Sequence, residues 1–486
     1  MTNLRDAIDF YHSLLDDEIG RESQGQMNHQ LHRRELFFGD RPLCTVLRPR
    51  FLTPEQYRLL QTAIRAIMPA FGKAHRAALG DAKFRAQFRL SDWEEKLIQV
   101  DPGFPAPSPT ARMDTFFAPH PLSPSPVEHP ERSAAKSKGR QERGEGWPQA
   151  GEGGEATLRF TEYNAETPAA PAYNDILSEV FYSLPIMRAF ERHYEVRPLP
   201  GRHHVLHALL DAYHHWGGRD RPRIAILDWR EVPTYSEFVL FQEYFESQGF
   251  ECIIADPREF EYRDGQLLAD GILPINLIYK RVLISELVQR CGLDHAVIRA
   301  VSEHAACMVN PFRCKILHKK TSLAVLSDEA NRHLFTADEA RAIDAYVPWT
   351  RTVAERRTAF EGKEIDLLPF LSQRKDDFVL KPSDEYGGKG IVLGWEVDQA
   401  QWDAALRASL ADPTIVQQRV PLPSEPYPSL VEGTVQVYDR MLDTNPYIWY
   451  GDYMSGCLTR LSTAALLNVT AGGGSTVPTF IIEKRT

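Results

Sequence analysis

The chain has 486 residues, a formal net charge of −10, 43% hydrophobic residues and 25% charged residues. Because this length exceeds what one hydrophobic core normally organises, we expect two or three packed subdomains. The acidic balance argues against a nucleic-acid partner, since no excess of Lys and Arg is available to neutralise a phosphate backbone.

The six cysteines form no CxxC pair, so the sequence indicates neither a zinc site nor a disulfide framework. No stretch approaches 18 uncharged apolar residues, and the first 20 residues lack the basic start and apolar run of a secretory signal. We therefore expect no membrane partner and a cytoplasmic location. Nothing in the sequence indicates the oligomeric state.

Residues 1–100 are expected to form a mostly helical region. A long helix should begin after Thr53, because Thr53 can cap its first turn and Pro54 suits the first helical position. Apolar residues such as Leu60 and Ile64 then recur at helical spacing.

The stretch 119–155 is rich in Pro, Gly, Ser and charge and contains few apolar residues. Such a segment cannot offset its ordering entropy, so we expect a disordered surface insertion. The runs "ARMDTFF" before it and "LRFTEYNAETP" after it would then be neighbouring strands of one hairpin with a very long loop.

Residues 201–312 alternate short apolar runs with helical patterns. The runs "RIAILDW", "FECIIADP" and "INLIYKRV" predict buried strands, and their alternation with helices predicts a mostly parallel sheet. No GxGxxG motif follows the first of these strands, so the sequence lacks a dinucleotide-binding fingerprint.

The last part of the chain is expected to combine helices with antiparallel strands. The run "NPFRCKILHKKTSLAVLSDE" places Lys315, Lys319 and Lys320 on one predicted helix. The run "DDFVLKPSDEYGGKGIVLGW" predicts a strand, a glycine-rich turn and a second strand, and antiparallel strands follow it.

The glycine-rich turn is the first candidate for a binding site. Glycine allows backbone N–H groups to approach phosphate oxygens closely, and Lys381 and Lys389 would supply positive charge beside Gly387 and Gly388. The alternative is a surface hairpin with solvated lysines, just as a basic run on a helix is usually a solvated face.

A second candidate combines carboxylates from the two predicted strands. Glu162 and Asn164 lie two positions apart, so on a strand both point to one face, and Asp114 would join them from the neighbouring strand. Such oxygen donors suit Mg²⁺. Arg112 would share the face of Asp114 and could stabilise an anionic transition state. The alternative is the exposed polar face of an antiparallel sheet.

The C-terminal run "RLSTAALLNVTAGGGSTVP" adds Arg460, Asn468 and the glycines 472–474. Three consecutive glycines suggest close approach of the backbone to another group, and a flexible loop is the alternative.

Taken in this order, these elements resemble the circularly permuted ATP-grasp enzymes, most closely the synthetase domain of the glutathionylspermidine synthase family. That family has an Arg-x-Asp strand followed by "EYNADTP", where this chain has "RMD" and then "EYNAETP". A Rossmann-like region, a lysine-containing helix, a "KP" strand with a glycine-rich loop and a C-terminal Arg/Asn segment follow. The order covers nearly all of the chain after about residue 40.

The resemblance implies an α/β and α+β fold of the permuted ATP-grasp type. After the helical region 1–100, it implies part of the ATP-grasp core at 101–200, a Rossmann-like (pre-ATP-grasp) parallel-sheet subdomain at 201–312 and the nucleotide-binding region at 313–486.

The resemblance also implies ATP and Mg²⁺ as cofactors, with roles for individual residues. Asp114, Glu162 and Asn164 would bind Mg²⁺. Arg112 and Arg460 would be catalytic residues that stabilise negative charge. The nucleotide would be held by Lys320 (or its neighbour Lys319), Lys381, Gly387, Gly388, Lys389, Gln417, Gln418 and Val420, with the stretch 417–420 hydrogen-bonding adenine.

The activity implied is that of an ATP-dependent, ADP-forming ligase that joins a small-molecule or peptide carboxylate to an amine through an acyl phosphate. The substrates do not carry over, because no amidase-like domain is recognisable at the N-terminus and the C-terminal segment differs from that of the glutathionylspermidine enzymes. Two alternatives are an ATP-dependent phosphotransferase and a catalytically silent nucleotide-binding scaffold.

Overall fold

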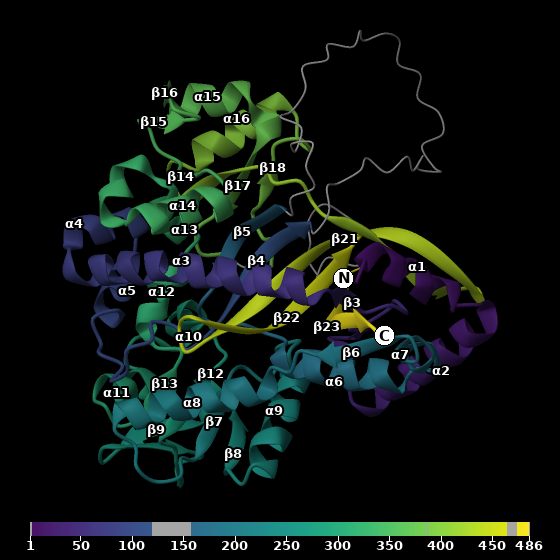
Figure 1. Cartoon of the computed structure of the whole chain (residues 1–486). Helices are drawn as coiled ribbons and strands as arrows, with labels where there is room; N and C mark the ends of the chain where they lie inside the picture. The colour runs from purple at the N-terminus through teal and green to yellow at the C-terminus, as the bar shows by residue number, and fades with distance from the viewer. Residues whose placement is uncertain (1, 119–156, 386, 464–473, 486) are drawn as a thin grey trace.

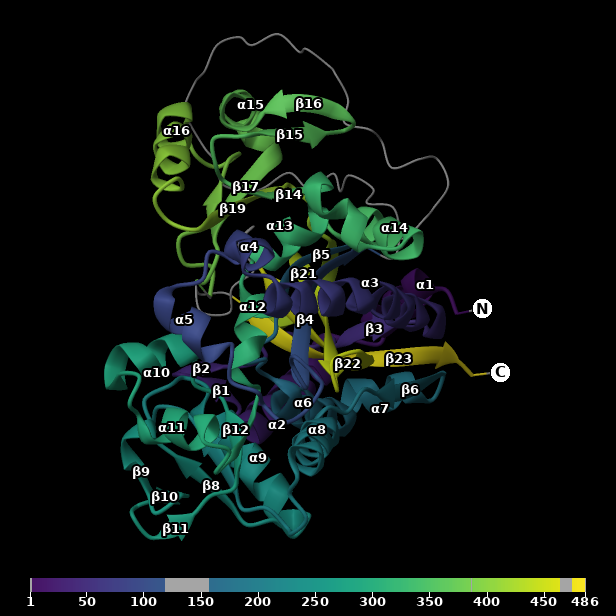
Figure 2. The same ribbon diagram turned by 90° about the vertical axis from the view of Figure 1, so that its left-hand side faces the viewer.

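The computed structural model describes residues 2–118, 157–385, 387–463 and 474–485. Three tiers of secondary structure lie one above another in Figure 1, and Figure 2 shows the same tiers from the side. A small sheet with its helices forms the upper tier, a large sheet crossed by a long helix forms the middle, and a parallel sheet forms the lower. No helix in the described ranges is long and apolar enough to cross a membrane.

The N-terminal region is mostly helical, as predicted. Its long helix α3 starts with a capping box, because Thr53 Oγ1 accepts from the Gln56 N–H at 3.3 Å and Gln56 Oε1 accepts from the Thr53 N–H at 2.9 Å. The elements are α1 (Leu4–Ser13), α2 (Asp17–Arg33), β1 (Phe37–Phe38), β2 (Arg41–Pro42), α3 (Pro54–Gly80), α4 (Ala82–Arg85), η1 (Ala86–Phe88) and α5 (Asp92–Leu97).

The middle tier is an eight-stranded sheet. Its main path has the order β3-β23-β22-β21-β4-β5, with β20 added beside β21 and β6 beside β23, and only the β3–β23 pair is parallel. The strands are β3 (Arg50–Leu52), β4 (Thr110–Ala118), β5 (Thr157–Asn164), β6 (Tyr194–Pro198), β20 (Ser424–Val431), β21 (Thr434–Trp449), β22 (Tyr453–Ser462) and β23 (Ser475–Lys484).

Strands β4 and β5 are paired antiparallel, as the hairpin prediction requires. Asp114 lies opposite Glu162 and Arg112 opposite Asn164, while Ala118 is paired with Thr157 at the far end. The segment 119–155, which we predict to be a disordered insertion, lies outside the described residues. The residues on either side of it, Ala118 and Thr157, are paired with each other, so a much shorter connection could join the two strands.

Replacing residues 119–155 by a short Gly/Ser linker should therefore leave folding intact. Because a shorter loop costs less closure entropy, we expect the free energy of unfolding to stay the same or to rise by up to about 2 kcal/mol. Thermal unfolding followed by circular dichroism measures this. A melting temperature lowered by more than about 5 °C would show that the segment contributes to packing.

The lower tier contains a four-stranded sheet of order β13-β12-β7-β8 in which every pair is parallel, so the parallel sheet predicted for residues 201–312 is present. A small antiparallel sheet, β11-β10-β9, lies beside it. The elements are α6 (Pro171–Ser183), α7 (Pro185–Glu191), α8 (Arg202–Trp216), β7 (Ile224–Leu227), α9 (Tyr235–Ser247), β8 (Cys252–Ala255), η2 (Pro257–Glu259), β9 (Phe260–Arg263), β10 (Gln266–Ala269), β11 (Leu273–Pro274), β12 (Leu277–Lys280), α10 (Ile284–Cys291), α11 (Ala296–Ser302) and β13 (Cys307–Val309).

The upper tier contains an antiparallel sheet of order β14-β19-β17-β18 and a small hairpin, β15-β16, packed around the buried Trp402 and Phe378. The strand, glycine-rich turn and strand predicted there are β17 and β18. The elements are η4 (Glu329–Leu334), α14 (Ala337–Tyr346), β14 (Thr350–Thr352), β15 (Arg357–Phe360), β16 (Lys363–Asp366), α15 (Leu367–Gln373), η5 (Lys375–Asp377), β17 (Phe378–Pro382), β18 (Val392–Leu393), α16 (Gln399–Ala408) and β19 (Thr414–Gln418).

The prediction of one helix carrying Lys315, Lys319 and Lys320 is wrong. The segment is divided into η3 (Phe312–Cys314), α12 (Lys315–His318) and α13 (Thr321–Ser327). The break lies at Lys319, whose ψ of 131° is extended rather than helical. Because of this break, the two adjacent lysines point in different directions.

Candidate active site

The β4–β5 hairpin brings together Arg112, Asp114, Glu162 and Asn164. Asp114 Oδ1 accepts a hydrogen bond from Arg112 Nε at 3.0 Å and another from Asn164 Nδ2 at 2.9 Å. The four residues predicted from the period-two pattern thus share one face of the β4–β5 pair. This pair forms one end of the main path of the large sheet, and β5 lies next to the upper tier in Figure 1.

A β-bulge shapes this face. The pairing shifts register between Asp114 and Thr115, so that Thr161 is the extra residue opposite them. The Thr161 carbonyl accepts from Lys381 Nζ at 3.3 Å, so the bulge brings β5 into contact with β17 of the upper sheet.

Arg460 on β22 reaches the same carboxylate. Its Nη2 lies 2.6 Å from Asp114 Oδ2 and 2.5 Å from Asp443 Oδ2. Burial disfavours the ionised form of Asp114, but Arg112 and Arg460 outweigh burial and lower the pKa of Asp114 to about 2. Burial raises the pKa of Asp443, an effect that Arg460 partly offsets. The two aspartates and two arginines form a network of alternating charge.

Lys320, and not Lys319, contacts the carboxylate face, through Glu162. Lys320 Nζ is 3.0 Å from Glu162 Oε1 and donates to the Glu385 carbonyl at 2.5 Å, which connects the carboxylate face to the start of the glycine-rich turn. Lys319 Nζ instead pairs with Glu94 of α5 at 2.9 Å.

Lys381, the last residue but one of β17, is a partly buried lysine beside the same face. It donates to Gln417 Oε1 at 2.8 Å and to the Thr161 carbonyl. Burial lowers the pKa of Lys381 to about 8, with a smaller opposing effect from the Glu162 carboxylate. A lysine with this pKa can change its charge under mild conditions.

A cavity of about 470 Å³ lies between the large sheet and the upper sheet and has a charged end and an apolar end. The charged end holds the predicted Asp114, Glu162, Lys381 and Arg460 together with Asp443. Most of the other lining side chains are aliphatic or aromatic, and the polar ones among them are Thr161, Gln417, Gln418 and Arg419. The lining residues outside the charged end are Phe116, Thr161, Val379, Ile391, Leu393, Trp395, Gln417, Gln418, Arg419, Val420, Pro421, Leu422 and Met441.

The predicted adenine-binding stretch 417–420 borders the apolar end. The Gln417 side chain is already used, because its amide nitrogen donates to Thr350 Oγ1 and its oxygen accepts from Lys381. The N–H of Gln418 donates to the Trp349 carbonyl. The N–H of Val420 donates to no group in the described part of the chain, so it is available to a bound molecule.

The described residues of the glycine-rich turn lie outside the lining of the cavity, although we predict that they bind the nucleotide. Gly387 and Gly388 have φ of 64° and 77°, which explains why glycine occupies these positions. Among the described residues, neither these glycines nor Lys389 lines the cavity. The Lys389 side chain is 76% exposed and pairs with Glu385 at 3.3 Å. Asn468 and the glycines 472 and 473 lie outside the described residues.

Sequence reasoning missed Asp443 of β21. The run "DTN" places Asp443 and Asn445 two positions apart on a strand, which is the same pattern as Glu162 and Asn164. Applying the period-two argument to the third strand would have found it.

The residues present fit a magnesium site shared with a nucleotide. Within the described ranges, no three His, Cys, Asp or Glu side chains could hold a metal ion by themselves. Mg²⁺ is commonly held by one or two carboxylates together with substrate phosphates. Asp114 and Glu162, opposite each other in register with Asn164 alongside, supply two carboxylates and an amide oxygen for this mode.

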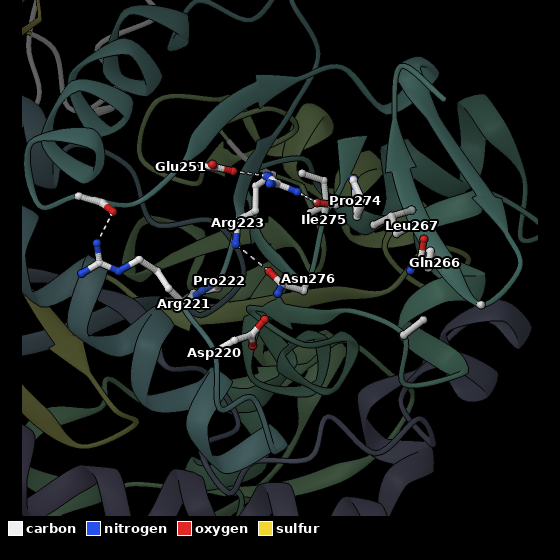
Figure 3. Close-up of a pocket in the computed structure, with 13 residues that line it drawn as sticks. Asp220, Arg221, Pro222, Arg223, Glu251, Gln266, Leu267, Pro274, Ile275 and Asn276 are labelled. Carbon is white, nitrogen blue, oxygen red and sulfur yellow. Dashed lines mark hydrogen bonds and ion pairs between the residues drawn. The ribbon is translucent and has the colours of Figure 1, made fainter. Parts of the chain in front are cut away.

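A larger cavity of about 620 Å³ lies in the lower tier (Figure 3). It is lined by Arg223, Glu251 and Asn276, which directly precede β7, β8 and β12. Ligands of open α/β sheets bind at the carboxyl ends of the strands, and this cavity lies at the amino ends. Arg223 also pairs with Glu251 and donates its N–H to Asn276 Oδ1 at 2.8 Å. We therefore assign the site to the first cavity.

No protein-family model matches the chain, and comparison with curated proteins gives no match either. A solved structure of a glutathione synthetase-like effector from Globodera pallida is similar over 96% of this chain and 98% of that one, with a TM-score of 0.55 and 11% identity. A D-alanyl-alanine synthetase A from Vibrio cholerae aligns over 53% of this chain and 74% of that one, at 11% identity and a TM-score of 0.29.

The likeness to the glutathione synthetase-like effector covers nearly the whole of both chains, so it concerns the entire fold. It shows that this chain shares the fold of that protein. At 11% identity it carries no substrate or residue role to this chain. The second likeness is too low to carry an argument.

Proposed function

We propose that this protein is an ATP-dependent, ADP-forming ligase of the ATP-grasp type that joins a carboxylate to an amine. The observation that carries the proposal is one cavity with Asp114 and Glu162 in register and cationic side chains around them. The full-length likeness to a synthetase-like fold supports it. Circular permutation and kinship with the glutathionylspermidine synthase family belong to the proposal, on the basis of the "RMD" and "EYNAETP" motifs.

The proposed chemistry has two steps. A carboxylate oxygen of the acid attacks the γ-phosphorus of ATP, the bond from that phosphorus to the β,γ-bridging oxygen breaks, and ADP leaves with the electron pair. The amine then attacks the acyl phosphate carbon, phosphate leaves, and the proton of the amine passes to solvent. Such transfer depends mainly on positioning and charge neutralisation, so no Ser or Cys nucleophile is required.

The residues that line the cavity, and Arg112, Asn164 and Lys320 beside them, have distinct roles in this proposal. Lys320 and Lys381 contact the phosphates, while Arg112 and Arg460 stabilise the charge of the transferring phosphoryl group. Mg²⁺, held by Asp114, Glu162 and Asn164, would neutralise phosphate charge. The purine would lie against the apolar wall, with the free N–H of Val420 as donor.

Glu162→Gln should weaken the binding of Mg·ATP at least about tenfold, because a carboxylate ligand and the partner of Lys320 are lost together. Isothermal titration calorimetry measures this. Glu364→Gln is the matched control, since Glu364 lies 62% exposed on β16 away from the cavity. Unchanged affinity in the Glu162 variant would contradict the metal assignment.

ADP release across a set of carboxylic acids, with and without amines, distinguishes the activities. A ligase needs both co-substrates for sustained turnover. Sustained release with an acid alone would indicate a phosphotransferase. Binding of Mg·ATP without ADP release from any pair would favour the silent scaffold.

A further inference from the structure

Asp443 is a buried carboxylate at the charged end of the cavity whose role the proposed function leaves open. It lies on β21, is 2% exposed and is opposite Arg460 in register. A buried carboxylate requires compensation. Arg460 supplies the positive charge that compensates it.

Asp443 holds Arg460 through three hydrogen bonds. The Arg460 N–H donates to Asp443 Oδ1 at 3.0 Å, while Nε and Nη2 donate to Oδ2 at 2.9 and 2.5 Å. Arg460 has one further carboxylate partner, Asp114, through Nη2 alone. Asp443 therefore determines the direction of the guanidinium more than Asp114 does.

Asn445 in turn fixes Asp443 to strand β4. Its Nδ2 donates to Asp443 Oδ1 at 2.7 Å, and its Oδ1 accepts from the Thr115 N–H at 3.0 Å. Thr115 lies at the register shift of the β4–β5 pair, next to Asp114. A continuous chain of contacts thus connects Thr115 to Asn445, Asp443, Arg460 and back to Asp114.

We propose that Asp443, braced by Asn445, is a positioning residue that keeps Arg460 directed at the transferring phosphoryl group. The inference rests on the proposed function, in which Asp114 would be one of the residues that hold Mg²⁺. The contact between Arg460 and Asp114 would then compete with the metal. Asp443 would remain as the carboxylate partner of Arg460. A guanidinium held by two of its nitrogens keeps its orientation without reorganisation during the transfer.

The test compares probes of the ground state and of the transferring state. Mg·ATP and Mg·ADP probe nucleotide binding, and Mg·ADP with aluminium fluoride mimics the transferring phosphoryl group. Asp443→Asn keeps the shape of the side chain but weakens its hold on Arg460. We expect the affinity for the aluminium fluoride complex to fall about 100-fold and that for Mg·ATP to change less than about threefold. Asp439→Asn, at an exposed position of the same strand, should change neither.

Three outcomes overturn the inference. If Asp443→Asn weakens all three probes equally, Asp443 only supports the fold of the site, and if it changes none, Arg460 does not depend on it. If the unmodified protein binds no Mg·ATP, the proposed function fails and takes this inference with it. Should Asp443→Asn not fold, Asn445→Ala tests the same chain of contacts, with a selective loss of about tenfold expected for the aluminium fluoride complex.

Discussion

Glu166→Ala should lower the free energy of unfolding by about 3–5 kcal/mol, because it leaves the buried Lys280 without its carboxylate partner and Lys315 with Asp384 alone. Glu166 is fully buried after the end of β5. Its Oε1 accepts from Lys280 Nζ at 3.0 Å and from the Ile284 N–H at 2.7 Å, and its Oε2 lies 3.3 Å from Lys315 Nζ. The change removes all three contacts at once.

The position of Glu166 means that its removal affects several parts of the fold. Lys280 ends β12 of the lower sheet, and Lys315 begins α12 and pairs with Asp384 at 2.6 Å after β17. One carboxylate therefore connects the large sheet, the lower sheet and the base of the glycine-rich turn. Its removal should loosen all three together.

Urea unfolding followed by circular dichroism measures the effect. Glu179→Ala is the control, because Glu179 on α6 forms ion pairs with Arg34 and Arg202 while 47% of its side chain is exposed, and such pairs contribute less than about 1 kcal/mol. If Glu166→Ala cost no more than the control, the buried cluster would contribute little to stability.

The contacts of Glu166 also predict how the free energy of unfolding changes at acidic pH. Burial opposes ionisation of Glu166, but Lys280, Lys315 and His318 outweigh burial and hold its pKa well below the usual range. A depressed folded-state pKa gives stability that is present above the unfolded pKa of about 4.3 and is lost as the pH falls below it. The difference between wild type and Glu166→Ala should therefore shrink on acidification.

The carboxylate face could be predicted from the sequence because alternation along a strand is a local property. Asp114, Glu162 and Asn164 converge as the period-two pattern requires, and the only long-range step is the pairing of two strands across the 119–155 segment. The capped start of α3 is equally local.

What could not be predicted depends on contacts between distant segments. Because the helix breaks at Lys319, Lys319 pairs with Glu94 and its neighbour Lys320 pairs with Glu162. Helical spacing alone cannot predict this difference. Glu166 continues the alternation of β5 in the sequence, but the strand ends at Asn164 and Glu166 turns to lysines 114 and 149 positions away. Lys389 follows two glycines, whose turn directs it to solvent.

Lys381→Met should raise the Kd for Mg·ATP roughly 30-fold or more, because the change removes a positive charge that contacts the phosphates in the proposed function. Among the described residues, Lys381 is the only one of the predicted phosphate-binding lysines that lines the cavity, and it lies on β17 of the upper sheet. Lys389→Met is the matched control, because that side chain is 76% exposed, and it should leave the Kd unchanged.

The pKa of Lys381 extends this prediction to pH. Burial lowers that pKa to about 8, so the charged form that attracts phosphate is lost as the pH rises through 8. Mg·ATP affinity of the wild type should fall about tenfold between pH 8 and 9.5, whereas Lys381→Arg, which stays charged, should remain nearly flat. Calorimetric titrations across this range measure both. A wild-type decline that persists unchanged in Lys381→Arg would assign the titration to another group and remove Lys381 from the phosphate site.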